Sequence, residues 1–314
     1  MKLLKLSRLG EFGLIERLAK RQSRLSGTVI GIGDDCAVLK HPTSNLQLQN
    51  ENKCQFQLVT TDALIEGVHF RRKGLSYFAL GQKALAASIS DIAAMGGWPT
   101  HAVVTIGLPQ GLNVKAVDQL YQGLTRLAKR NKIDIVGGDT VASPKALMVS
   151  ITLLGAVEKK NLLLRSTARV GDLICVTGRF GGPAAKGYSS RYSLPVTRYL
   201  EARALAKAKL ATAMIDSSDG LVRSVLEICK ASKVGARIFE GQVPIAKGAT
   251  LAQALYGGEE YELVFTTRPG RRLKAKGQRS TVVGQVVEQR GGVKLVDKRG
   301  RIKKLRSGGY EHFR

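Results

Sequence analysis

Apolar residues recur along this chain at helical and strand spacings, and short polar or glycine-rich stretches separate the recurring segments. The most regular segment is 78–95, where Leu85, Ile89 and Ile92 follow one another at steps of four and three residues in an alanine-rich run. Gly96-Gly97 and Pro99 come directly after it and are typical of a helix end. The pattern therefore predicts a helix over 78–95.

The other apolar segments mix both spacings, which is typical of a protein with helices and sheets. In the first half they predict helices over 11–20 and 114–130, strands over 57–62, 101–108, 133–136 and 147–157, and a polar loop over 42–53. In the second half they predict strands over 173–177, 263–267 and 281–287, helices from 195 to about 210 and from 221 to a stop at Gly235, and a basic hairpin around 298–300.

A domain boundary is predicted where two lysines follow a finished strand, at 158–161. It divides the 314 residues into an N-terminal domain, 1–157, and a C-terminal domain, 158–314, both of ordinary size. The expected fold class is α/β or α+β.

The bulk composition favours a soluble protein, with 44% hydrophobic and 24% charged residues. The apolar runs are short, and residues 1–10 alternate basic residues with leucine, so neither a membrane span nor a cleavable signal is indicated. We therefore expect a cytoplasmic protein. The cysteines and histidines are too dispersed for a zinc site, and the cysteines are expected to be buried or free thiols: Cys36, Cys54, Cys175, Cys229, His41, His69, His101 and His312.

The net charge of +26 and the pI of about 10.2 are unusual. Such a charge suits a nucleic-acid binder, because phosphate neutralisation supplies most of that affinity. The basic residues are nevertheless spread over the whole chain, and aromatic residues make up only 5% of it, which is too few for base stacking. A general basic bias, or a field that attracts anionic substrates, explains the charge at least as well.

The aspartates are the most informative polar residues, because only 24 residues are acidic against 50 basic ones. Seven of the eleven lie in turns flanked by glycine, serine or threonine, at expected strand ends, or beside a helix end: Asp34, Asp35, Asp62, Asp91, Asp139, Asp216 and Asp219. Asp91 falls in the last turn of the predicted helix, where a carboxylate opposes the helix dipole unless a cation compensates. Asp219 has a second interpretation as the cap of the helix that follows it.

Oxygen ligands without cysteine or histidine are what Mg²⁺ prefers, and Mg²⁺ usually completes its shell with water and substrate phosphates. The pattern therefore indicates a nucleoside triphosphate as substrate and phosphoryl transfer or ligation as reaction. The phosphate-binding motifs of P-loop proteins and of protein kinases are absent. Arg165 and the glycine-rich loop 178–182 are the candidates for holding phosphate.

Taken together and in order, seven short motifs closely resemble the thiamine-monophosphate kinase family of the aminoimidazole ribonucleotide synthetase-like superfamily. They are Gly31-Ile32-Gly33-Asp34-Asp35, Thr60-Thr61-Asp62 with Gly67-Val68-His69-Phe70, Ser90-Asp91-Ile92-Ala93-Ala94-Met95-Gly96, Gly137-Gly138-Asp139-Thr140, Asp216-Ser217-Ser218-Asp219-Gly220, Gly257-Gly258-Glu259-Glu260-Tyr261-Glu262 and Gly309-Tyr310-Glu311-His312-Phe313. The resemblance runs over nearly the whole chain.

The resemblance implies ATP-dependent phosphorylation of thiamine monophosphate to thiamine diphosphate by direct in-line transfer. It also implies several Mg²⁺ ions and a two-domain fold that forms a homodimer through its N-terminal sheet. The implied magnesium ligands are Asp35, Thr60, Thr61, Asp62, Asp91, Asp139, Asp216 and Asp219, with Asp34 as a ligand or as a residue that orients the turn. The implied nucleotide contacts are Gly138, Asp139, Arg165, Ser218 and Tyr121, and the implied substrate contacts are His69, Glu259 and Tyr310.

Some positions depart from the family pattern or have a plainer interpretation. Glu260 and Glu311 stand where the family usually has aspartate, and the loop 178–187 differs in detail. His69 could be a core histidine, Tyr310 ordinary packing, and Glu260 a structural acid. The alternatives for the whole chain are another ATP-dependent synthetase of the superfamily and, more distantly, a basic nucleic-acid-binding protein.

Overall fold

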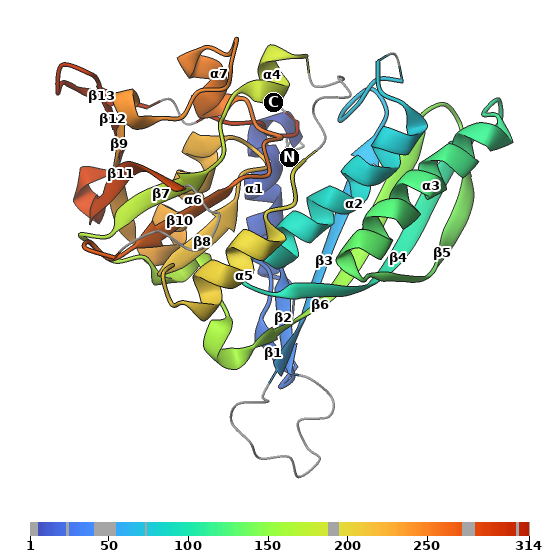
Figure 1. Cartoon of the computed structure of the whole chain (residues 1–314), viewed down its shortest axis with the longest axis horizontal. Helices are drawn as coiled ribbons and strands as arrows, with labels where there is room; N and C mark the ends of the chain where they lie inside the picture. The colour runs from blue at the N-terminus through green and yellow to red at the C-terminus, as the bar shows by residue number, and fades with distance from the viewer. Residues whose placement is uncertain are drawn as a thin grey trace, which may run out of the picture.

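A computed structural model describes residues 6–22, 25–40, 55–72, 74–187, 195–271, 280–305 and 308–313. The loop predicted over 42–53, together with His41 and Cys54, lies outside these ranges. The chain folds into two sheets with helices packed on them (Figure 1), so the predicted fold class is confirmed.

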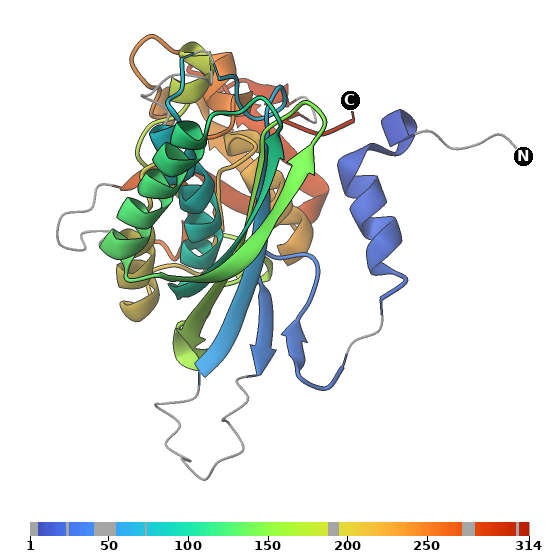
Figure 2. The same ribbon diagram turned by 90° about the vertical axis from the view of Figure 1, so that its right-hand side faces the viewer.

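The first half of the chain forms a six-stranded sheet of strand order β1-β2-β3-β6-β4-β5. Its strands are β1 (Thr28–Ile30), β2 (Ala37–Lys40), β3 (Gln55–Ile65), β4 (Trp98–Pro109), β5 (Asp134–Ser143) and β6 (Met148–Glu158). Helices α2 (Tyr77–Ala94) and α3 (Val114–Asn131) cover one face and bury a core of aliphatic side chains there (Figure 2). The helix predicted over 78–95 is α2, and it begins at the capping residue Ser76.

Two glycines allow α2 and α3 to pack closely. A Cβ atom on Gly81 would lie 2.1 Å from the carbonyl oxygen of Leu120, and one on Gly123 would lie 2.0 Å from that of Phe78. These approaches are possible only without a side chain, so the two helices are fixed to each other by backbone contact.

The other face of this sheet keeps its side chains at least partly exposed. Alternation along the strands places apolar and hydroxyl side chains on it: Val59, Thr61, Ala63, Val103, Thr105, Ser150, Thr152 and Leu154. We call this set the open face. Soluble sheets usually place charged residues on a face that stays in water, whereas these eight side chains carry no charge.

The second half forms a seven-stranded sheet of order β13-β12-β9-β11-β7-β10-β8. Its strands are β7 (Leu173–Thr177), β8 (Ala213–Asp216), β9 (Val234–Phe239), β10 (Leu263–Thr267), β11 (Ser280–Glu288), β12 (Val293–Val296) and β13 (Ile302–Lys304). Helices α6 (Leu221–Ser232) and α7 (Leu251–Tyr256) pack on one face. On the other face, α5 (Tyr199–Lys207) packs together with Ala93 of α2, so α2 contacts both halves of the chain.

Two short elements complete the fold. Helix α1 (Leu6–Ala19) is broken at Gly10, whose φ of 69° is not helical. It lies against the second half, where the Phe12 ring packs on the Arg223 guanidinium at 3.2 Å. Helix α4 (Gly182–Ala185) follows the glycine-rich loop.

Three local predictions are wrong. Asp62 and Asp139 lie inside β3 and β5 and not at strand ends, because the apolar residues that follow them continue each strand. Helix α6 does not reach Gly235: it ends at Ser232, where Lys233 adopts a left-handed conformation, and Gly235 already belongs to β9.

The remaining bulk predictions concern cysteines and membrane segments. Cys36, Cys175 and Cys229 are free and buried, as expected. Within the described ranges, the structure has no helix that combines the length and apolarity needed to span a bilayer.

Candidate active site

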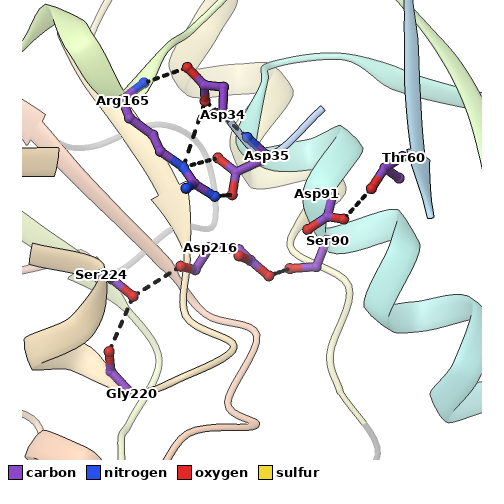
Figure 3. Close-up of polar contacts among 9 residues, drawn as sticks. All are labelled: Asp34, Asp35, Thr60, Ser90, Asp91, Arg165, Asp216, Gly220 and Ser224. Carbon is purple, nitrogen blue, oxygen red and sulfur yellow. Dashed lines mark hydrogen bonds and ion pairs between the residues drawn. The ribbon is translucent and has the colours of Figure 1, made fainter. Parts of the chain in front are cut away.

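Three aspartates from distant parts of the chain meet near the end of α2 (Figure 3). Asp35 lies in the turn between β1 and β2, Asp91 in the last turn of α2, and Asp216 at the end of β8. One carboxylate oxygen from each lies within 4.8 Å of the other two. We call these three residues the aspartate cluster. Its hard oxygen atoms have the chemistry and spacing to hold a divalent cation.

Neighbouring hydroxyl groups and one glycine orient the cluster. Gly33, with φ of 125°, makes the turn that presents Asp35. The Thr60 hydroxyl donates a hydrogen bond of 2.5 Å to Asp91 Oδ2, and the Ser90 hydroxyl donates one of 2.7 Å to Asp216 Oδ2 (Figure 3). These bonds engage only one oxygen of Asp91 and one of Asp216, which leaves the other oxygen of each for a ligand.

The cluster is electrostatically unfavourable by itself. Burial, and then the neighbouring Asp35 carboxylate, raise the pKa of Asp216 to about 8. Burial and then the negative charges of nearby aspartates raise the pKa of Asp91 well above its usual value. A bound cation would favour the ionised forms, so the same residues that repel each other would bind it strongly.

Arg165 supplies positive charge beside the cluster. Its Nη2 and Nε donate hydrogen bonds of 2.5 and 3.2 Å to the two carboxylate oxygens of Asp35. Its backbone N–H donates to Asp34 Oδ2 at 3.2 Å. Asp34 also accepts the backbone N–H of Asp35, at 3.1 Å, and burial raises the pKa of Asp34 to about 7. These contacts favour a role for Asp34 in orienting the turn.

A cavity of about 740 Å³ lies between the two halves of the chain and is bounded by further predicted residues. Asp62, Ser218 and Asp219 line it, and burial raises the pKa of both aspartates to about 6. The Asp62 carboxylate is close enough to Asp91 and Asp216 to raise their pKa values as well. Asp62 therefore connects the aspartate cluster with the cavity. Asp219 does not cap α6, whose N-cap is Gly220.

The three predicted substrate contacts also line this cavity: His69, Glu259 and Tyr310. His69 Nδ1 accepts the backbone N–H of Ile65 at 3.0 Å, and burial followed by nearby positive groups lowers its pKa to about 4. His69 is therefore neutral near pH 7. Its ring lies 5.2 Å from that of His312, so two histidines that look dispersed in the sequence meet here.

The C-terminal segment and α1 together close one side of the cavity. The Tyr310 hydroxyl lies 3.2 Å from His312 Nδ1, and the Tyr310 backbone N–H donates to the Asp219 carbonyl at 3.2 Å. The backbone N–H of His312 donates to Glu11 Oε2 at 3.0 Å. Residues from both ends of the described chain thus build this wall.

Two glutamates that follow Glu259 contact the glycine-rich loop and the end of the strand before it. Glu260 Oε1 accepts the backbone N–H of Gly181 at 2.9 Å. Glu262 accepts the Thr177 hydroxyl at 2.6 Å and forms two hydrogen bonds with Arg198, of 2.6 and 2.7 Å. This contact favours the structural role that the sequence left as one alternative for Glu260. Through it, Glu260 fixes the loop that we expected to lie near phosphate.

Four predicted residues lie away from the cluster: Thr61, Gly138, Asp139 and Tyr121. Alternation along β3 points the Thr61 side chain to the open face, where it accepts a hydrogen bond from Thr152. Gly138 and Asp139 lie on β5, separated from β3 by β6 and β4, which is roughly 14 Å at the usual strand spacing. Tyr121 lies on α3, in a separate depression of about 630 Å³.

The sequence did not point to Lys83, which the structure places behind the cavity. Its ammonium group contacts both Glu259 carboxylate oxygens, at 2.8 and 2.9 Å. One signal was available, because Lys83 and Asp91 are the only charged residues in the eighteen residues of α2. Arg198 and Glu11 carried no comparable signal.

Comparisons with known proteins agree with this geometry. Residues 33–157 match the family described as AIR synthase related protein, N-terminal domain, and residues 169–297 match AIR synthase related protein, C-terminal domain. Thiamine-monophosphate kinase of Synechococcus elongatus is 33% identical over 90% of each chain, and that of Bacillus subtilis is 34% identical over 82% of this chain and 83% of its own. The structure of AaThiL complexed with AMPPCP and TMP superposes with a TM-score of 0.84 at 29% identity, covering 99% of this chain and all of that one.

Proposed function

The chain belongs to the thiamine-monophosphate kinase family, and we propose on this basis that it transfers a phosphoryl group from ATP to thiamine monophosphate and releases thiamine diphosphate. The observation that carries the proposal is the position of Asp62. This residue lines the cavity that holds the candidate substrate contacts and also lies beside the aspartate cluster. A phosphate acceptor in the cavity would therefore meet a triphosphate held at the cluster.

Mg²⁺ ions would be held by the carboxylates of Asp35, Asp91 and Asp216, with Asp62 and Asp219 beside them. The three cluster oxygens are close together, and the side chains that hydrogen-bond to Asp91 and Asp216 are the hydroxyl groups of Thr60 and Ser90. When bound, the ions would neutralise the charge of the triphosphate and of the transferring group.

The protein's own residues have mainly a positioning role in this reaction. The accepting oxygen belongs to a phosphate that is already ionised, so no strong general base is needed. The low pKa of His69 agrees with this, because a neutral imidazole can orient a substrate through its second nitrogen without changing charge. Arg165 is the group placed to contact a phosphate next to the cluster. We therefore expect direct in-line transfer.

The test is a Mg²⁺-dependent assay of the purified protein with ATP and thiamine monophosphate, with thiamine diphosphate measured by chromatography. We expect product only when both substrates and Mg²⁺ are present. A folded protein that forms no thiamine diphosphate, or that acts on a different acceptor, would contradict the proposal.

Asp62→Asn provides the matched test of the site. It keeps the size of the side chain and removes its charge, so we expect turnover to fall by about a thousandfold or more with the fold unchanged by circular dichroism. Glu288→Gln, at the exposed end of β11, is the control and should have no effect. Retained activity of Asp62→Asn would exclude a role in metal binding.

We further propose that two chains pair through the open face and that Gly138, Asp139 and Tyr121 contribute to the nucleotide site of the partner. Their distance from the cluster within one chain supports this. The test mixes two inactive variants, Asp139→Asn and Asp216→Asn, under conditions that exchange subunits. If sites are shared across the dimer, mixed dimers contain one intact site, and about a quarter of normal activity returns. If Asp139 acts in its own chain, the mixture stays inactive.

A further inference from the structure

Lys83 is a buried charge for which the proposed reaction has no assigned role. It lies in the middle of α2, and its side chain is only 1% exposed, which makes it one of the largest fully buried side chains among the described residues. An ammonium group at such a position is costly unless every N–H finds an acceptor. Here the three available acceptors are the two carboxylate oxygens of Glu259 and the backbone carbonyl of His69, the last at 3.2 Å. The ammonium group is thus fully satisfied.

The two residues that Lys83 contacts are both cavity residues with candidate substrate roles. Lys83 holds His69 through its backbone and Glu259 through its side chain, and the two lie 190 residues apart in the sequence. No other described residue is recorded as a hydrogen-bond partner of the Glu259 carboxylate. The direction of that carboxylate therefore depends on the ammonium group.

The backbone at Glu259 also requires support. Glu259 has φ of 61° and Gly258 φ of 78°, so two successive residues are left-handed. A non-glycine residue in this region is strained and persists only where its surroundings hold it. The Glu259 N–H donates to the Ser218 carbonyl at 2.6 Å, which fixes one end of the residue, and the ion pair with Lys83 fixes the other.

We propose that Lys83 is a positioning residue of the thiamine monophosphate site, which acts by holding the Glu259 carboxylate in the orientation that binds the substrate. The inference rests on the proposed function, because it takes Glu259 as a substrate contact. Thiamine carries a positively charged ring, and a carboxylate fixed at the cavity wall is a suitable partner for it. Lys83 lies behind that carboxylate and needs no contact with the substrate itself.

A purely structural role for Lys83 predicts something different. If the ion pair only joined α2 to the second half of the chain, its loss would lower stability and would affect both substrates alike. A positioning role predicts a selective effect on thiamine monophosphate, and one that depends on the presence of Glu259.

The experiment compares Lys83→Met, Glu259→Gln and the double variant, with Lys115→Met on the exposed start of α3 as control. We measure KM for each substrate, kcat and the unfolding midpoint. Lys83→Met should raise KM for thiamine monophosphate by about tenfold or more, since it leaves the partly buried Glu259 carboxylate without its partner. It should change KM for ATP less than about twofold. Lys115→Met should match the wild type.

The double variant decides the result even if Lys83→Met alone does not fold, because it contains neither charge. Adding Lys83→Met to Glu259→Gln should change KM for thiamine monophosphate by less than about twofold, since the group that Lys83 positions is already neutral. A multiplicative effect, or an equal rise in both KM values, would overturn the inference. If the wild type forms no thiamine diphosphate, the proposed function fails, and calorimetric binding of thiamine monophosphate to wild type and Lys83→Met tests Lys83 separately: equal affinities overturn the inference.

Discussion

Burial strongly affects the protonation state of single side chains in this protein, and Glu260 is the clearest case outside the aspartate cluster. Its Oε1 accepts the Gly181 N–H, whereas its buried Oε2 has no hydrogen-bond partner within the described part of the chain. Burial raises its pKa from 4.5 to about 8. At neutral pH the folded protein therefore keeps this carboxyl group largely protonated.

This pKa predicts how stability changes with pH. The folded chain keeps the Glu260 proton up to about pH 8, whereas the unfolded chain loses it near 4.5, so unfolding releases a proton between these values. The group's contribution to the free energy of unfolding is therefore complete below 4.5 and is lost as the pH rises toward 8. Glu260→Gln keeps the acceptor for Gly181 and removes the titration. Between pH 5 and pH 9, the free energy of unfolding of this variant should rise relative to that of the wild type by a few kcal/mol, at most about 5.

Urea unfolding of both proteins at the two pH values measures this gain. A constant difference between them would show that Glu260 titrates normally. Thr250→Val, at the exposed cap of α7, is a control that should shift stability equally at both pH values.

Candidate site residues could be recognised from the sequence where a charged side chain is unfavourable in the element predicted around it. Asp91 stood out because a carboxylate at the C-terminal end of a helix opposes the helix dipole, and the structure places Asp91 in the aspartate cluster. Lys83 carried a similar conflict within an apolar helix, but its partner Glu259 lies 176 residues away in the sequence. A buried ion pair is recognisable only when both partners are known to meet, which the sequence alone does not show.

At the scale of elements, β5 is the most informative strand. It lies at the edge of the first sheet, and nearly all of its side chains are exposed. A Cβ atom on Gly138 would lie 1.9 Å from the Val104 carbonyl oxygen, whereas one on Gly137 would meet nothing within 4 Å. Gly138 is therefore required for pairing with β4, whether or not it also contacts a nucleotide.

We therefore expect Gly138→Ala to destabilise the protein by about 2 kcal/mol or more, because β5 must move away from β4. Gly137→Ala should cost less than about 1 kcal/mol. Chemical unfolding of the two variants measures the difference. Equal values would mean that the strand edge can shift without cost.

Periodicity identified the main elements because their apolar faces are long, as in α2. It failed where a polar residue interrupts a strand. Asp62 was expected to end a strand, yet β3 pairs with β6 without interruption from Gln55 to Ile65. Asp62 is tolerated there because its side chain points to the cavity and the other acids, a long-range arrangement that local pattern cannot show.

At the scale of the whole molecule, the open face predicts the assembly. Val103→Lys places a charge on this face and should convert a dimer into a monomer, as measured by light scattering. If the nucleotide site is shared, turnover should fall with the dimer fraction. Val114→Lys, at a position that is 74% exposed on the start of α3, is the matched control and should stay dimeric. A Val103→Lys protein that remains dimeric would mean that another surface forms the contact.

The arrangement of the two halves could not be worked out from the sequence pattern. The resemblance of seven motifs to a known family supplied the function, whereas the spacing of acids alone indicated only magnesium and a triphosphate. Ser90 and Asp216 are 126 residues apart and hydrogen bonded, and the sequence gives no local sign of such a contact. The division at 157/158 and the assignment of individual ligands remain predictions.

The contact between Glu11 and the His312 backbone has a consequence for the making of the protein. These residues are 301 positions apart, so at usual rates of translation roughly 15 to 60 s pass between their emergence from the ribosome. During that interval the first sheet can fold, but the cavity lacks the wall that carries Tyr310. A nascent chain thus acquires Asp35, Asp62 and Asp91 early, Asp216 later and its complete pocket last. Incompletely synthesised copies should therefore not compete with finished ones for thiamine monophosphate.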